Sequence, residues 1–273
     1  MVIESFLGPV EAESKPWKLI FLGFLYSSIS IFLAQLVFAD QASLVMVFFT
    51  TMACIPLMHS TMRLEEKKDF LFDKEWKLLN EHRKAIMFFL LLFIGFTLGF
   101  TLWYVILPES LSENLFNIQT RTILSINNKI SGNFEPSTRF FFEILFNNFK
   151  VMIFCILFSF IYGSGSIFII VWNASVISAA IGNLIKASMA TLALHQSVSY
   201  GFMRYFIHGL PEVTGYLVAG LAGGIISVAV IRHDYMNAKF ENILFDASEL
   251  ISLAIVILII AAYIETYITP VFF

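Results

Sequence analysis

The stretch HGLPEVTGYLVAGLAGGIISVAVI, residues 208–231, decides how this chain folds. From Val213 to Ile231 it is almost wholly apolar, and it is long enough for a helix that crosses a bilayer, which takes about 20 apolar residues. His208 and Glu212 stand directly before that run. A charged group at the centre of a bilayer costs about 2.5 kcal/mol or more, so both residues are candidates for a functional position.

The composition of the whole chain agrees with a membrane protein. Hydrophobic residues make up 58% of the sequence and charged residues only 14%, whereas about a quarter of the residues in soluble domains are charged. We therefore predict an all-α, polytopic transmembrane helix bundle. The net charge of −3 and the absence of a basic stripe with interleaved aromatics give no indication of nucleic-acid binding.

Seven segments are predicted to span the membrane. Five are unambiguous, and a sixth and a seventh come from the long apolar region between Phe149 and Ile185. That region is too long for one span, and Gly163-Ser164-Gly165-Ser166 is typical of a turn or helix break. The predicted spans are Leu19–Phe38, Ser43–Met62, Ala85–Leu107, Phe149–Tyr162, Ile167–Ile185, Val213–Ile231 and Ser248–Ile268.

Basic residues set the predicted orientation. They concentrate between His59 and Lys84, which places this loop and the N-terminus in the cytoplasm. We divide the chain into residues 1–84, a two-span hairpin with the basic loop, and residues 85–273, a five-span core. Within that core, residues 108–148 lie outside, and their apolar residues at helical spacing predict interfacial helices.

Small and amide residues in the later spans suggest how the helices pack. Gly220 and Gly224 form a GxxxG pair, a spacing that lets helix backbones approach closely. Packing within one chain is the first interpretation and a homodimer the second. Asn148 and Asn173 are candidates for amide bonds between helices, which fix helix register.

The segment before residue 213 admits two interpretations. Proline disfavours helical dihedrals in the residue before it, so the chain is predicted to break at Gly209-Leu210, with Pro211 starting the next helix and Glu212 at its positive end. This is either an ordinary helix start or a broken-helix site of the kind that transporters use. Residues 187–207 are too polar for a lipid-facing span and are predicted to be buried or re-entrant.

The remaining ionisable candidates do not form a metal-ligand pattern. His195 and His208 lack a third ligand at a suitable spacing, so we expect no metal and no cofactor. Glu265 lies near the outer end of the last span, where its carboxylate either reaches the interface or pairs with His208 or Arg204.

Four motifs, taken in order, resemble those of the stage II sporulation protein M family, particularly its archaeal members. They are Asn147-Asn148, Tyr162-Gly163 followed by Trp172-Asn173-Ala174, His208-Gly209-Leu210-Pro211-Glu212, and Ile264-Glu265-Thr266 with Thr269-Pro270. The family usually has Asn-Gly in place of Asn173-Ala174 and Pro-His-Gly in place of Ile207-His208-Gly209. The resemblance runs from about residue 85 to residue 273, and it implies a five-span core with an added N-terminal hairpin.

In spore-forming bacteria the family member resembles a membrane anchor for a cell-wall-degrading engulfment complex, without catalytic activity. The resemblance therefore implies a non-enzymatic scaffold or assembly subunit with a membrane or extracytoplasmic protein partner. A permease or channel-like subunit with a polar intramembrane path is the alternative. An intramembrane hydrolase is disfavoured, because Tyr162 stands where a Gly-x-Ser-Gly nucleophile motif around Ser164 would need glycine.

Overall fold

The computed structural model describes residues 17–71, 75–131, 137–162, 165–231 and 239–273, and these residues form helices and short connections only. Seven of the helices are long and apolar enough to cross a membrane, which confirms the predicted fold class. Helices satisfy their own backbone hydrogen bonds, and this is what a bilayer demands of a spanning segment. The chain is a multi-pass membrane protein.

The chain forms long helices that alternate in direction, joined in places by short helices. The first half contains α2 (Trp17–Val37), the short η1 (Ala39–Gln41), α3 (Ala42–Leu71), α4 (Glu75–Ile106), α5 (Glu109–Leu115) and α6 (Asn117–Ser131). The second half contains α7 (Ser137–Tyr162), α8 (Ser166–Ser188), α9 (Leu194–Ile231), α10 (Lys239–Tyr263), the π-helical turn η3 (Ile264–Ile268) and α11 (Thr269–Phe272).

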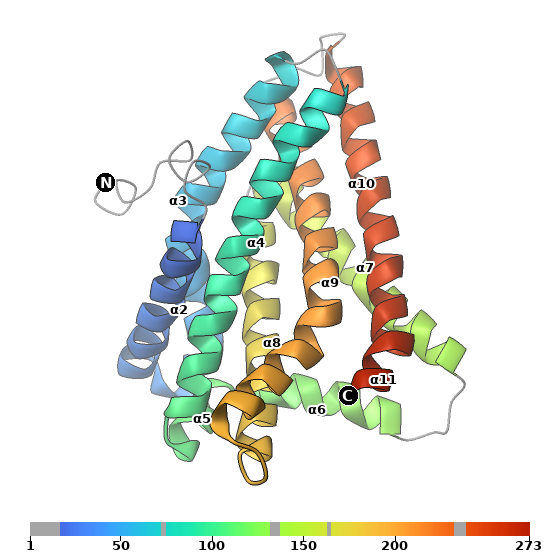
Figure 1. Ribbon diagram of the computed structural model, residues 1–273. Helices are drawn as coiled ribbons and strands as arrows, with labels where there is room; N and C mark the ends of the chain where they lie inside the picture. Colours follow the sequence, from blue (N-terminus) through green and yellow to red (C-terminus); the bar gives the residue numbers. More distant parts are fainter. Residues whose placement is uncertain (1–16, 72–74, 132–136, 163–164, 232–238) are drawn as a thin grey trace.

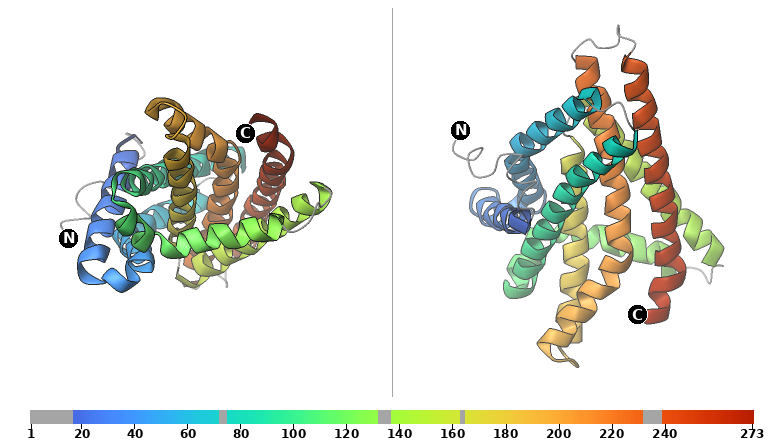
Figure 2. Two further views of the ribbon diagram at one scale, coloured as in Figure 1. Left: turned by 90° about the horizontal axis from the view of Figure 1, so that it is seen from below. Right: turned by 45° about the horizontal axis from the view of Figure 1, so that its top comes forward.

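The long helices run alternately up and down, so their connections gather at two ends of the bundle (Figure 1). The end of α3, the start of α4, the end of α9 and the start of α10 lie at one end of the bundle, while α5, α6 and α11 lie towards the other. Figure 2 shows α6 lying across the helices rather than along them. This arrangement of α6 agrees with its apolar residues at helical spacing, which predicted a helix lying along an interface.

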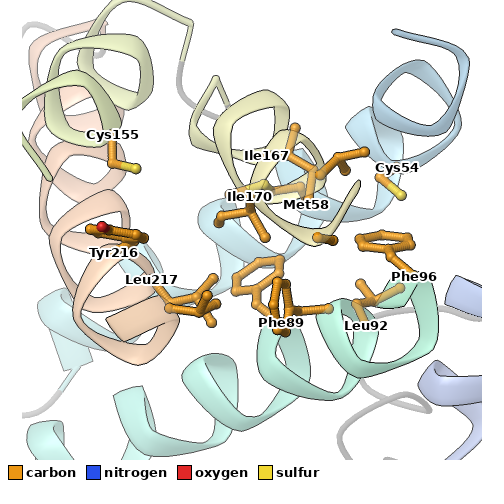
Figure 3. Close-up of a cluster of buried hydrophobic side chains, with 14 of the residues drawn as sticks. Cys54, Met58, Phe89, Leu92, Phe96, Cys155, Ile167, Ile170, Tyr216 and Leu217 are labelled. Carbon is orange, nitrogen blue, oxygen red and sulfur yellow. The ribbon is translucent and has the colours of Figure 1, made fainter. Parts of the chain in front are cut away.

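Aromatic side chains of α4 fill the centre of the bundle. Phe88, Phe93, Phe96 and Phe100 are almost wholly buried. Figure 3 shows this side of α4 facing side chains of α3, α8 and α9. The interior is therefore packed by large apolar groups along much of α4.

Two glycines bring α2 and α4 into backbone contact. A Cβ atom on Gly23 would lie 2.5 Å from the carbonyl oxygen of Leu92, and one on Gly95 would lie 2.3 Å from that of Ile20. Neither position has room for a side chain. The first helix of the hairpin thus packs directly on the first helix of the core, at a separation that only glycine allows.

Glycines of α9 serve contacts inside this chain. A Cβ on Gly220 would lie 2.8 Å from the hydroxyl oxygen of Ser166 on α8, and one on Gly223 would lie 2.6 Å from the carbonyl oxygen of Ile156 on α7. Gly224 is buried. Gly220 of the predicted pair therefore lies where α8 approaches α9, and Gly223 lies where α7 does.

The structure corrects the prediction for the segment before residue 213. α9 is one 38-residue helix that begins at Leu194 and continues through Gly209 and Pro211. The predicted break at Gly209-Leu210 is wrong, and so is a re-entrant segment over residues 187–207. Proline removes one helical hydrogen bond, and membrane helices accommodate this loss by bending; Figure 1 shows α9 bent in its lower part.

The start of the fourth span also needs correction. α7 begins at Ser137, and residues 138–161 qualify as the candidate span, so residues 138–148 are not a separate interfacial helix. Arg139 and Glu143 form an ion pair one turn apart at 3.5 Å, which moderates the cost of charges at this end of the helix. Because α7 begins at Ser137, Asn148 lies near the middle of the helix and not at its start.

The predicted turn between the fourth and fifth spans lies between Tyr162, where α7 ends, and Ser166, where α8 begins. Gly163 and Ser164 lie outside the described residues. Gly165 precedes α8, and a Cβ there would lie 2.3 Å from the carbonyl oxygen of Phe158. The close approach of the chain to α7 thus explains glycine at position 165.

Candidate functional site

Four polar side chains line one face of α9. Arg204, His208, Glu212 and Tyr216 are spaced four residues apart, so they lie above one another on successive turns. The stripe begins near the start of α9 and ends near its middle. Its neighbours are α7 and the chain from η3 to Phe273.

The upper end of this stripe is a hydrogen-bonded group in which Tyr216 and Asn148 are buried and Glu212 is half-buried. The hydroxyl of Tyr216 lies 2.5 Å from Oε1 of Glu212 and 3.1 Å from Oδ1 of Asn148 on α7. Tyr216 is 0% exposed and Asn148 is 3% exposed. Figure 3 shows Tyr216 beside Cys155, also on α7. A residue from the middle of α7 is thereby joined to two residues from the middle of α9.

The lower end of the stripe contacts the last residues of the structure. Nδ1 of His208 lies 3.2 Å from the hydroxyl of Thr269, and Nη1 of Arg204 donates to the backbone carbonyl of Phe273 at 3.3 Å. The hydroxyl of Thr269 in turn lies 3.2 Å from the carbonyl oxygen of Ile264. These contacts hold the chain after α10 against α9.

Glu265 lies in the π-helical turn η3 and interacts electrostatically with Glu212. The sequence suggested a partner for it in His208 or Arg204. In the structure those two residues contact Thr269 and Phe273 instead. Carboxyl groups of α9 and η3 thus influence each other, and the second lies in a π-helical turn, a feature that is frequent at functional sites.

Two other sequence candidates lie away from this group. Nδ2 of Asn173 donates to the carbonyl of Ile169 at 2.8 Å, within its own helix α8. His195 is exposed in the first turn of α9. Among the described residues, no three His, Cys, Asp or Glu side chains converge as metal ligands. We name the set that does converge, Asn148, Glu212, Tyr216 and Glu265, the carboxylate cluster.

A second buried polar group was not foreseen. Gln119 of α6 is 0% exposed, although α6 lies across the end of the bundle. Its Oε1 accepts from the hydroxyl of Ser43 on α3 at 2.6 Å, and its Nε2 donates to the carbonyl of Ser43 and to the hydroxyl of Ser175 on α8, both at 3.2 Å. The side chain fastens α6 to two spanning helices.

Contacts of α5 strengthen this attachment. Nζ of Lys186 on α8 donates to the hydroxyl of Ser112 at 3.1 Å and lies 4.9 Å from the centre of the Tyr104 ring. Nδ2 of Asn114 donates to the carbonyl of Ala39 at 2.8 Å. We call α5 and α6 together the platform.

Replacing Tyr216 with phenylalanine tests the carboxylate cluster. The ring would still fill its place, but Glu212 and Asn148 would lose their shared partner, and an unsatisfied buried polar group costs about 1–3 kcal/mol. We expect a lower thermal midpoint in detergent. Tyr263→Phe is the matched control, because Tyr263 is exposed and should tolerate the change. Equal midpoints for both variants would show that the phenol hydroxyl contributes nothing.

Comparison with known proteins places this arrangement in a family. The profile of the family described as Stage II sporulation protein M matches residues 85–270, which include α7 to α10 and the carboxylate cluster. The chain belongs to that family. It is also 29% identical over 159 residues to an uncharacterized protein of Methanocaldococcus jannaschii; the match covers 56% of this chain and 84% of the relative. No solved structure matches the chain.

Family membership explains why the motifs occur in their observed order. The match begins in the first half of α4 and leaves out α2 and α3. The two helices of the N-terminal hairpin are thus additional to the matched region, and Gly23 and Gly95 pack the first of them onto it.

Proposed function

We propose that this protein is a non-enzymatic membrane scaffold, and that the platform is its docking surface for a protein partner. The observation that carries the proposal is the burial of Gln119. A glutamine with both ends hydrogen-bonded between α3 and α8 fixes α6 in position across the bundle. A preorganised surface binds a partner without first losing conformational freedom.

The outward side of the platform offers groups that a partner can contact. Asn117, Arg121, Leu124 and Ser125 are exposed on α6. Leu124 is apolar, Arg121 is a cation, and Asn117 and Ser125 offer hydrogen-bonding groups. Protein interfaces likewise combine an apolar centre with a polar rim. An exposed apolar residue on a fixed helix is also suited to contact with a membrane-embedded partner.

The orientation that we propose follows from the basic residues between His59 and Lys84. They adjoin the α3–α4 connection, so that end of the bundle and the N-terminus are cytoplasmic, and the platform faces the other side. The partner is accordingly a membrane or extracytoplasmic protein. A second copy of this chain is the other candidate occupant, and we expect no nucleic acid to bind.

The permease alternative gains no support from α9. Beyond Tyr216 the helix continues with Leu217, Val218, Leu221 and Ile225, all buried and apolar. A polar path through the bundle would need hydrogen-bonding groups there, and these side chains have none to offer.

Site-specific photocrosslinking tests the scaffold proposal. A photoreactive amino acid is placed at Arg121 or Leu124 in the full-length protein in native membranes, and the adducts are identified by mass spectrometry. We expect the same protein adduct from both positions. Val256 on α10 is the control position: it is 52% exposed, and it lies in a candidate span, where lipid is the expected neighbour.

Three results would contradict the proposal. The first is that Arg121 and Leu124 form adducts with lipid alone. The second is that Val256 and Leu124 capture the same proteins. The third is that a photoreactive group on the captured protein does not crosslink back to α6. Adducts made only with a second copy of the chain would identify a homodimer and contradict a heterologous partner.

A further inference from the structure

The carboxylate cluster brings two carboxyl groups together. Glu212 of α9 and Glu265 of η3 interact electrostatically. Arg204, about two turns before Glu212 on α9, donates to the carbonyl of Phe273, and Nδ1 of His208 lies 3.2 Å from the hydroxyl of Thr269. On α7, Glu143 and Lys150 are exposed. Ionising both carboxyl groups would place two negative charges close together, which is costly in a poorly solvated site without a bound counter-charge.

Hydrogen-bond counting leaves one side of the Asn148 amide without a partner. Tyr216 has one hydroxyl proton but two acceptor atoms within reach, Oε1 of Glu212 at 2.5 Å and Oδ1 of Asn148 at 3.1 Å. The short bond to Glu212 takes the proton. If the Asn148 amide is turned by 180°, its Nδ2 donates to the phenol oxygen of Tyr216. Its Oδ1 then occupies the buried position where Nδ2 has no partner in the structure, so this oxygen is available as a ligand.

The adjoining π-helical turn holds a second unpaired atom. The hydroxyl of Thr266, the residue after Glu265, is buried and without a hydrogen-bond partner, and the residue is 7% exposed. Oxygen atoms of carboxylates, amides and hydroxyls are the ligands that hard cations prefer. Two buried polar groups thus lack partners close to the carboxylates: Asn148 is joined to Glu212 through Tyr216, and Thr266 follows Glu265 in the chain.

We propose that the carboxylate cluster binds one small monovalent cation, with Na⁺ as the probe, held between α7, α9 and η3. Glu212, Glu265 and the carbonyl oxygen of Asn148 supply the ligands, and the hydroxyl of Thr266 completes the set. The bound ion offsets the charge of the ionised carboxylates and ties the chain after α10 to the middle of α7 and α9. Nothing in this inference depends on a partner at the platform.

Thermal unfolding of the purified full-length protein in detergent tests the site. Midpoints are measured at pH 7.5 over a series of NaCl concentrations, with choline chloride keeping the ionic strength constant. We expect a saturable rise of several degrees with Na⁺, because a ligand that binds only the folded state raises its stability. Equilibrium binding of radioactive Na⁺ should approach one ion per chain.

Variants assign the effect to the cluster. Glu265→Gln removes a charged ligand and should abolish both the Na⁺-dependent rise and the binding of Na⁺. Glu241→Gln is the matched control, since Glu241 is exposed on α10, and it should keep both. If Glu265→Gln does not fold, the wild-type comparison of Na⁺ with choline still decides the question.

Several outcomes would overturn the proposal. Equal midpoints in NaCl and choline chloride would do so, as would a rise produced by Ca²⁺ or Mg²⁺ and not by Na⁺. Stabilisation by lower pH with no response to Na⁺ would show that a proton on Glu212 completes the hydrogen-bond count instead. None of these results bears on crosslinking at the platform, so the two proposals can fail separately.

Discussion

Replacing Gly95 with leucine is expected to destabilise the protein by about 3 kcal/mol, at the upper end of the cost of overpacking. The first atom of the new side chain would lie 2.3 Å from the carbonyl oxygen of Ile20 and 3.0 Å from the Cα of Gly23. Backbone atoms cannot move aside as a flexible side chain can. The two helices would have to separate, and the contact between the hairpin and α4 would be lost along its length.

The effect is measured as the fall in the thermal midpoint of the detergent-solubilised protein and as the fraction recovered as a single species in gel filtration. Leu98→Phe is the control, because Leu98 is exposed on the same helix and a larger side chain there has open space. A Gly95→Leu variant as stable as Leu98→Phe would show that α2 does not pack on α4 as the structure has it.

The number and type of spanning helices could be predicted because membrane insertion depends on local sequence. Apolar length is enough to identify α2, α3, α4 and α10 as spans, and two glycines with two serines marked the connection between α7 and α8. These signals act over one helix at a time. They need no knowledge of what each helix packs against.

Helix bounds depended on tertiary contacts, and the sequence therefore misplaced two of them. Pro211 predicted a helix start, but the contacts of α9 with α7 and with the chain after α10 hold the helix continuous across it. Likewise, Asn147 and Asn148 suggested the entrance of a span. Asn148 instead lies within α7, where its amide has a buried partner in Tyr216.

The carboxylate cluster was partly visible in the sequence. Asn148, Glu212 and Glu265 each stood out as polar residues near apolar runs, but nothing in the spacing showed that they converge. Tyr216 was overlooked inside an apolar run, although its position four residues after Glu212 could have revealed it. Gln119 gave no signal, because its partners Ser43 and Ser175 are small residues in distant spans.

Replacing Gln119 with alanine should cost about 3 kcal/mol, because it leaves a cavity and removes the hydrogen bonds of Ser43 and Ser175. The loss is confined to the attachment of α6. We therefore expect amide hydrogen exchange to accelerate relative to the wild type, and to do so more in α6 than in α9. The thermal midpoint should also be lower than that of the wild type. Asn117→Ala is the control, because Asn117 is exposed on the same helix.

The same variant connects stability to the proposed function. If the platform docks a partner because α6 is held in place, Gln119→Ala should weaken the protein adduct formed from Leu124, while Asn117→Ala should weaken it less. The Na⁺ response of the carboxylate cluster should persist in both, since Gln119 bonds to α3 and α8 and not to the helices of the cluster. An undiminished adduct alongside rapid exchange in α6 would mean that docking does not require a fixed platform.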